Sequence, residues 1–109
     1  MVLVLVNVPR GNVAEVMSRT LVKEELAACV TVHPATSTYR WEGKVQCDDE
    51  ETLTIKTTLS VLEEVRARVY ALHPYETPEF LVVAVDATHS GRSYLDWVHK
   101  SVKPRAKNQ

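Results

Sequence analysis

The segment HPYETPEFLVV, residues 73–83, gathers side chains that could bind a metal ion. His73 carries an imidazole, a group that suits copper and zinc, and Glu76 and Glu79 lie close enough in sequence to orient it or to join it as ligands. A histidine at the end of a helix is also favoured by the helix dipole alone. The segment therefore predicts either a metal site that includes His73 or a stiff connector that leads into a buried strand.

The two cysteines offer a second kind of chemistry. Cys29 could add a soft thiolate ligand for copper, although its apolar surroundings are typical of a small buried cysteine. Cys47 precedes the acidic run 48–51, which disfavours a reactive thiolate and could itself hold hard cations loosely or form a solvated hairpin arm. Two cysteines are too few for a disulfide framework or a four-ligand zinc site, so we expect both to be reduced thiols.

Motifs for catalysis and nucleic-acid binding are missing from the sequence. It contains no G-x-S-x-G motif, no paired Cys-His motif and no dinucleotide fingerprint. The stretch NVPRGN lacks the glycine-rich anion loop of an acylphosphatase, and TLTIKTT lacks the aromatic residues of an RNA-recognition module. We therefore expect a protein that is not an enzyme and that binds no nucleic acid.

The composition is that of one globular domain spanning residues 1–109. Apolar residues make up 45% and charged residues 25%, and the net charge is −1, with basic residues clustered only in the tail at 103–109. Such a balance provides no cationic surface for nucleic acid or a membrane. The opening apolar run stops at Pro9 and lacks a basic leader, so we expect no signal peptide, no membrane span and a cytoplasmic location.

Hydrophobic periodicity predicts the strands and helices that would position these side chains. β-branched or alternating apolar residues predict strands at 2–8, 28–33, 37–41, 52–58 and 80–85. Helical spacing predicts helices at 12–26, 60–73 and 93–102. The first strand is apolar at nearly every position, which is typical of a strand buried on both faces.

Capping and turn residues mark the boundaries of these elements. Helix caps are predicted at Asn12, at a capping box formed by Ser60 and Glu63, and at Ser93. Gly43 predicts a hairpin turn, Pro34 predicts a bulge or kink, and Pro74 ends the second helix. The residues predicted to face the sheet are Val13, Val16, Met17 and Leu21 in the first helix, Leu62, Val65, Val69 and Leu72 in the second, and Tyr94, Leu95, Val98 and Val102 in the last.

The order strand, helix, strand, strand, helix, strand and terminal helix predicts an α+β protein. Right-handed crossovers make it a ferredoxin-like βαββαβ sandwich with an extra C-terminal helix. In this topology the last strand lies at a sheet edge and one sheet face is bare, yet FLVVAV is apolar on both faces and Trp41 lies on the hairpin. Exposed apolar edges invite pairing with another chain, so we expect a homo-oligomer.

Four segments carry a family resemblance: ELAACVTVHPATSTYRWEGKV (25–45), IKTT (55–58), HPYETPEFLVV (73–83) and YLDWV (94–98). Together they resemble the CutA divalent-cation tolerance proteins. The hallmarks occur in order at the proper spacing, from Cys29 after two alanines to His73-Pro74-Tyr75. The resemblance implies a cytoplasmic, very stable homotrimer of ferredoxin-like subunits that is linked to heavy-metal tolerance and binds copper or another divalent cation.

The resemblance also points to copper ligands. In some relatives they are a cysteine in the first strand and two adjacent histidines at the end of a helix. The matching positions here hold Val6 and Leu72 ahead of His73, so one of the three ligands is present. This departure favours weak binding of metal ions.

A trimer would also create a cleft between subunits. The residues predicted to line it, together with Glu79, are Lys56, Tyr75, Trp41 and Arg40. Such a cleft predicts an alternative function, that of a regulatory or scaffold trimer that binds a small effector or a protein partner. Equally, Lys56 could pair with Glu79 and Trp41 could simply pack, which would leave no ligand pocket.

Overall fold

The computed structural model of the protein describes residues 1–104, so residues 105–109 of the basic tail lie outside the described residues. Its centre is an antiparallel sheet with the strand order β2-β3-β1-β4. The strands are β1 (Val2–Pro9), β2 (Cys29–Trp41), β3 (Lys44–Thr57) and β4 (Leu81–Ala84). The helical elements are α1 (Val13–Lys23), the 3₁₀ turn η1 (Leu59–Val61), α2 (Leu62–Leu72) and α3 (Arg92–Ser101). The predicted α+β class is confirmed.

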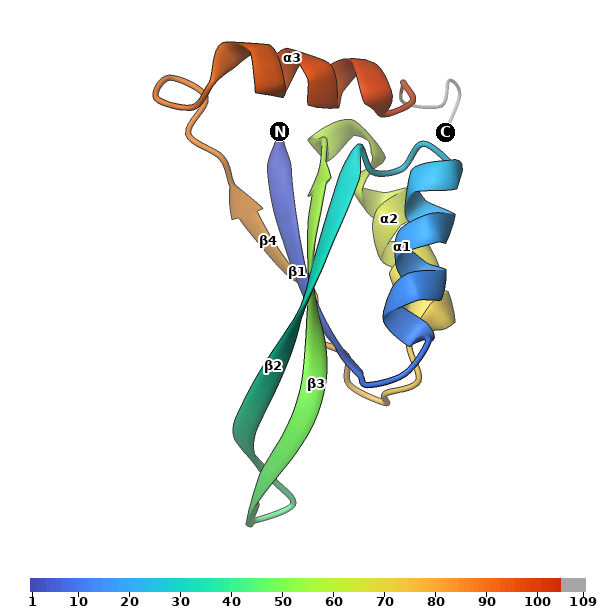
Figure 1. Ribbon diagram of the computed structural model, residues 1–109, viewed down its shortest axis with the longest axis vertical. Helices are drawn as coiled ribbons and strands as arrows, with labels where there is room; N and C mark the ends of the chain where they lie inside the picture. The colour runs from blue at the N-terminus through green and yellow to red at the C-terminus, as the bar shows by residue number, and fades with distance from the viewer. Residues whose placement is uncertain (105–109) are drawn as a thin grey trace.

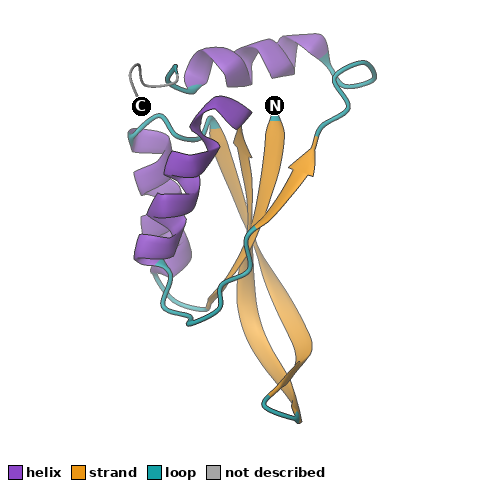
Figure 2. Ribbon diagram, turned by 180° about the vertical axis from the view of Figure 1, so that it is seen from behind, coloured by secondary structure: helices purple, strands orange, loops and turns teal. Residues whose placement is uncertain are grey.

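The helices cover one face of the sheet. Figure 1 shows α1 and α2 side by side against that face and α3 across the end where β1 begins. Seen from behind in Figure 2, the opposite face carries no helix along the length of the hairpin. In the described chain, no helix combines the length and the apolar composition that crossing a membrane requires.

The core lies between the sheet and this helical layer. Its fully buried side chains include Val4, Val6 and Val8 of β1, Leu53 and Ile55 of β3, Met17 and Leu21 of α1, and Val65 and Val69 of α2. Intervening residues of β1 are only half-buried, because their side chains point to the uncovered face. The prediction that β1 is buried on both faces is therefore wrong for the described chain, because only the face toward the helices is fully buried.

Strands β2 and β3 form a long hairpin whose register runs unbroken from Cys29↔Lys56 to Trp41↔Lys44. Pro34 pairs with Glu51 inside this ladder, so the predicted bulge or kink is absent from the described register. The proline is tolerated because β2 is an edge strand, where a missing donor leaves no neighbour unsatisfied. The predicted turn at Gly43 is confirmed: Glu42 has φ 51° and Gly43 has φ 78°, as a type I′ turn requires.

The helix caps differ from the predicted ones. Asn12 is the N-cap of α1 as predicted, but its side chain makes no capping hydrogen bond. The N-cap of α2 is Val61, because η1 takes up the residues that the capping box would have used. The N-cap of α3 is Gly91, which leaves Ser93 inside the first turn.

The end of α1 is a Schellman motif built without glycine. Leu26 N–H donates to Leu21 O at 2.9 Å, and Glu25 N–H donates to Val22 O at 3.1 Å. Glu25 adopts φ 60°, the left-handed conformation that glycine usually supplies at this position. The helix therefore ends at Lys23 and not at the predicted residue 26.

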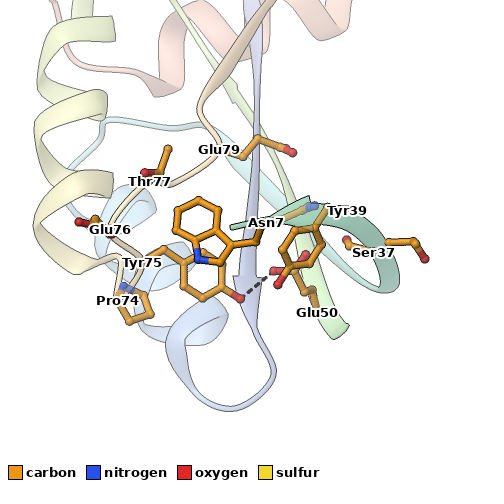
Figure 3. Close-up of a pocket in the computed structure, with 11 residues that line it drawn as sticks. Asn7, Ser37, Tyr39, Glu50, Pro74, Tyr75, Glu76, Thr77 and Glu79 are labelled. Carbon is orange, nitrogen blue, oxygen red and sulfur yellow. Dashed lines mark hydrogen bonds between the residues drawn. The ribbon is translucent and has the colours of Figure 1, made fainter. Parts of the chain in front are cut away.

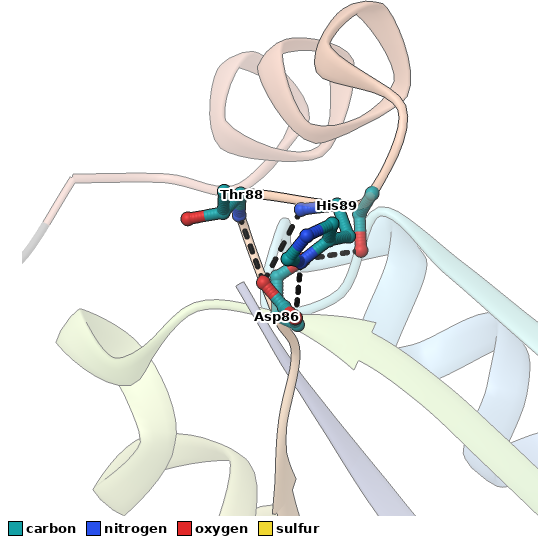
Figure 4. A network of polar contacts seen from close by, with 4 residues as sticks. Asp86, Thr88 and His89 are labelled. Carbon is teal, nitrogen blue, oxygen red and sulfur yellow. Dashed lines mark hydrogen bonds and ion pairs between the residues drawn. The ribbon is translucent and has the colours of Figure 1, made fainter.

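Two residues predicted to face the core are exposed: Val16 of α1 and Tyr94 of α3. The helix α3 instead buries Leu95 and Val98, with Val102 just beyond its end. A loop closed by Asp86 leads into it (Figure 4). Asp86 accepts hydrogen bonds from the backbone N–H groups of Thr88 at 3.0 Å and His89 at 3.2 Å, and its other oxygen lies 2.9 Å from His89 Nδ1. These contacts, the His89 side chain first, lower the pKa of Asp86.

Candidate functional site

The connector between α2 and β4 is tied to the central strand by His73. Its Nε2 lies 2.7 Å from the carbonyl oxygen of Asn7, and its Nδ1 accepts the backbone N–H of Tyr75 at 3.2 Å. Because Nδ1 acts as acceptor, Nε2 carries the proton and donates to Asn7. His73 as a residue is 9% exposed, and its ring centroid lies 4.8 Å from that of Tyr75. His73 thus holds the connector in place with both of its ring nitrogens.

Beside this anchor the connector and the hairpin enclose a cleft of about 660 Å³ (Figure 3). Its walls come from β1, from both strands of the hairpin and from the connector. The lining residues are Asn7, Ser37, Thr38, Tyr39, Trp41, Glu50, Pro74, Tyr75, Glu76, Thr77 and Glu79. Pro74 and Pro78 fix the backbone φ at two positions of the connector, which limits its flexibility beside the cleft.

The polar centre of the cleft is the pair Tyr75–Glu50. Tyr75 Oη donates to Glu50 Oε2 at 2.7 Å, and the Glu50 side chain comes from β3 with 6% of the residue exposed. Burial, and then this hydrogen bond and the charge of Glu50, hold the pKa of Tyr75 well above its ordinary value. The phenol therefore stays protonated and acts as a donor.

Two other ionisable groups that line the cleft also have a raised pKa. Burial raises the pKa of Glu79, and the Glu50 carboxylate adds to that rise. Tyr39 donates a hydrogen bond to Asp48, which raises the pKa of its phenol, and burial and the Asp48 charge act in the same direction. Burial at Glu79 and the hydrogen bond to Asp48 at Tyr39 are the main causes, and both favour the protonated form of the side chain.

Comparison with known proteins places these features in a family. The model of the CutA1 divalent ion tolerance protein matches residues 2–101. The chain belongs to the CutA family. The divalent-cation tolerance protein CutA of Thermus thermophilus is 44% identical over 99 residues, which cover 90% of this chain and 94% of that protein. The chloroplastic protein CutA of Arabidopsis thaliana is 42% identical over 103 residues, which cover 94% of this chain and 56% of that protein.

The fold agrees with solved CutA structures. The structure described as the PII-like protein CutA from Nostoc sp. PCC 7120 in apo form superposes with a TM-score of 0.90 at 38% identity, and covers 95% of this chain and 99% of that one. The Thermus thermophilus relative is named a divalent-cation tolerance protein, and none of the three names states an enzymatic reaction.

The candidate metal ligands of this CutA chain do not come together. Cys29 pairs with Lys56, whereas His73 binds Asn7, which pairs with Thr52. The two sites on β3 are four residues apart, which is roughly 13 Å along a strand. Glu76 and Glu79 line the cleft, but in residues 1–104 no three His, Cys, Asp or Glu side chains are placed to hold one ion. The described residues therefore do not fit a resident copper ion.

The predicted cleft residues divide into two groups. Trp41, Tyr75 and Glu79 line the same cleft within one CutA chain. Lys56 and Arg40 lie outside its lining, and Lys56 donates to Thr31 with its Nζ 4.0 Å from Cys29 Sγ. The alternative in which Lys56 pairs with Glu79 is thus not the arrangement among the described residues.

Sequence reasoning missed two polar residues that line this CutA cleft. Glu50 lies in the run DDEE, which resembles a solvated arm, and Asn7 lies in a strand that looks apolar. A strand prediction extended back from residue 52 would have placed Glu50 on the same face as Thr52 and Thr54, the face that points away from the helices. Its contact with Tyr75 joins residues 25 positions apart, and no local pattern predicts that.

Proposed function

We propose that the protein serves divalent-cation tolerance as a cytoplasmic homotrimer of single-domain, ferredoxin-like subunits, without catalysing a reaction. The strand order β2-β3-β1-β4 with two helices on one face supports the ferredoxin-like assignment. Membership of the CutA family supports the tolerance role.

Uncovered apolar side chains support self-assembly. In β4, Leu81 is 54% exposed, and Val82 and Val83 are also exposed; at the far end of the hairpin Val45 is 69% exposed. A sheet edge and a hairpin arm of this character are stable in water when another chain covers them. Analytical ultracentrifugation at micromolar protomer concentration tests this part of the proposal: we expect a single trimeric species, and a compact monomer would contradict it.

The cleft carboxylates support weak, exchangeable binding of copper or another divalent cation. Glu76 and Glu79 stand on the connector and line the same cleft as the buried Glu50, so the observation that carries the proposal is a cleft with three carboxylates along its lining. Because these groups do not form a three-ligand set in the described chain, a bound ion would keep part of its water shell. Such a site suits a protein that responds to the concentration of free cation.

Calorimetric titration with Cu²⁺ tests the cation site. We expect the double variant Glu76→Gln/Glu79→Gln to weaken binding by about tenfold, because it removes two negative oxygen ligands. The matched control Glu63→Gln changes an exposed carboxylate on α2 and should leave binding unchanged. The variant His73→Ala separates the alternatives: if copper binding disappears in it and persists in the double glutamine variant, the ligand is the histidine.

A small organic effector is the second candidate for the cleft. The specific observation is that Tyr39, Trp41 and Tyr75 share a cavity of about 660 Å³ with hydrogen-bonding groups, which is the size and character of small-molecule sites. A thermal-shift screen of small metabolites tests it. We expect a stabilising compound whose effect is lost in Trp41→Ala and kept in Trp97→Ala, where the exchanged indole is also half exposed but lies on α3.

A further inference from the structure

The lining of the cleft has an unusual balance of charge. Glu50, Glu76 and Glu79 contribute carboxylates, whereas none of its eleven described lining residues is a lysine, arginine or histidine. The nearest basic candidates from the sequence, Lys56 and Arg40, lie outside the lining. The cavity therefore concentrates negative charge without an internal counter-ion.

The most buried of these carboxylates belongs to Glu50. Only 6% of the residue is exposed, and its Oε2 accepts the phenol of Tyr75. That hydrogen bond leaves the net charge in place, because the pKa of Tyr75 is raised and the phenol remains neutral. A desolvated carboxylate held in this way interacts more strongly with a cationic group than an exposed one does.

Aromatic rings complete the same cavity. Tyr39 and Trp41 come from β2 and Tyr75 from the connector, so aromatic residues line the cavity from two elements. Figure 3 labels two of them, Tyr39 and Tyr75. Aromatic rings attract cations through their quadrupole, most strongly when the cation is partly desolvated. Carboxylates combined with aromatic rings form the environment that recognises ammonium groups.

A metal ion and an organic ammonium ion need different arrangements of protein groups around them. A divalent metal needs several oxygen, nitrogen or sulfur ligands around one point, and residues 1–104 offer no group of three. An ammonium ion is satisfied by one or two carboxylates, a phenol oxygen and ring faces spread over a larger cavity. The volume of about 660 Å³ also exceeds what a single ion would fill.

We infer that the cleft binds a small organic ammonium ion, such as an aliphatic diamine, held by the carboxylates of Glu50 and Glu79 and by the ring of Trp41. This inference rests on the small-effector role proposed above and names the chemical class of that effector. The ammonium group donates to the carboxylates, and the aliphatic part of the ligand lies against the aromatic wall. An anionic molecule of the same length is repelled by the charge of Glu50, and a neutral one forms no ion pair with it.

Isothermal titration calorimetry with three probes of matched length tests the inference. The probes are 1,4-diaminobutane, 1,4-butanediol and succinate, in about 0.15 M salt so that long-range attraction is screened. We expect only the diamine to bind, with one site for each chain.

Three variants locate the binding. Glu50→Gln keeps an acceptor for Tyr75 and removes the charge, so we expect about tenfold weaker diamine binding with an unchanged circular dichroism spectrum. Trp41→Leu should weaken it by about threefold, the scale of a cation–π contact at a partly exposed site. The control Glu63→Gln lies on the exposed surface of α2 and should have no effect.

Specific outcomes overturn the inference. Succinate or butanediol binding as tightly as the diamine would do so, and so would a diamine affinity that is the same in the parent, Glu50→Gln and Trp41→Leu. If Glu50→Gln does not fold, Trp41→Leu and the three-probe comparison still decide the question. Copper titration of the same preparations keeps the two proposals apart: copper binding without diamine binding rejects the ammonium site alone, and failure of both rejects the cation-tolerance proposal as well.

Discussion

His73 provides a sharp test of how the connector is held. The substitution His73→Ala removes the hydrogen bond to the carbonyl of Asn7 at 2.7 Å and the one from the N–H of Tyr75 at 3.2 Å. Both backbone groups lose their hydrogen-bond partner at a position where only 9% of the His73 residue is exposed, so water replaces the imidazole only in part. The ring contact with Tyr75, at 4.8 Å between centroids, is lost as well.

The expected loss of stability follows from these three contacts. Each freed backbone group contributes about 1 kcal/mol, and the ring contact contributes about 1 kcal/mol more. We therefore expect His73→Ala to lower the free energy of unfolding by about 3 kcal/mol. His33→Ala replaces an exposed histidine of the edge strand β2 and should change it by less than about 0.5 kcal/mol.

Guanidinium unfolding followed by tryptophan fluorescence measures the difference. All variants are compared at one protomer concentration, because the stability of an oligomer depends on it. If His73→Ala and His33→Ala are equally stable, the hydrogen bonds of His73 carry no weight. The imidazole would then be available to a ligand, and the reasoning that separates it from a metal would fail.

Three further predictions concern the ladder, the helix end and the cleft. Thr57→Val should lower the free energy of unfolding by about 1–2 kcal/mol, because the fully buried hydroxyl donates to Leu26 O at 2.6 Å. Thr57→Ser keeps the hydroxyl donor for that carbonyl and should lose less stability than Thr57→Val in the same unfolding assay. Glu25→Gly should raise the free energy of unfolding by about 0.5–1 kcal/mol, and with it the melting temperature, since φ 60° favours glycine. A lower melting temperature would contradict the Schellman assignment. Because the pKa of Glu79 is raised, the folded chain binds that proton more tightly than the unfolded one, so stability falls as pH rises from the ordinary glutamate range through the raised value. Glu79→Gln should remove this fall and be the more stable protein above it, and identical pH profiles would refute the assignment.

Local patterns predict most elements of the fold because their signals are carried by neighbouring residues. The turn at Gly43 needs only a residue that accepts positive φ, and Pro74 ends a helix wherever it stands. Caps are less predictable, because Ser60 and Ser93 have the right residue type, yet the turn η1 and Gly91 take the capping positions. The sequence predicts a bulge or kink at Pro34, because it does not reveal that β2 is an edge strand, where a proline fits the pairing.

The candidate site is less predictable than the fold for a related reason. Tyr75 and Glu79 stand out because a rigid connector displays them. Glu50 acquires its role only when the register places it beneath that connector, and the register is set by pairing across the whole sheet. A histidine that satisfies two backbone groups looks, in sequence, the same as a histidine that is free to bind a metal.

The position of β1 in the sheet has a kinetic consequence. β1 is an inner strand of the sheet, and its pairing Val2↔Ala84 joins residues 82 positions apart, whereas the hairpin pairs Trp41 with Lys44. Sequence-distant pairings slow folding, because a long loop must close before its contacts form. We expect the β2–β3 hairpin to form first. The pairing of β1 with β4 can form only after residues 81–84 have been made. A nascent chain stalled before residue 80 would therefore leave one edge of the apolar strand β1 without its partner. That edge would need protection from pairing with neighbouring chains.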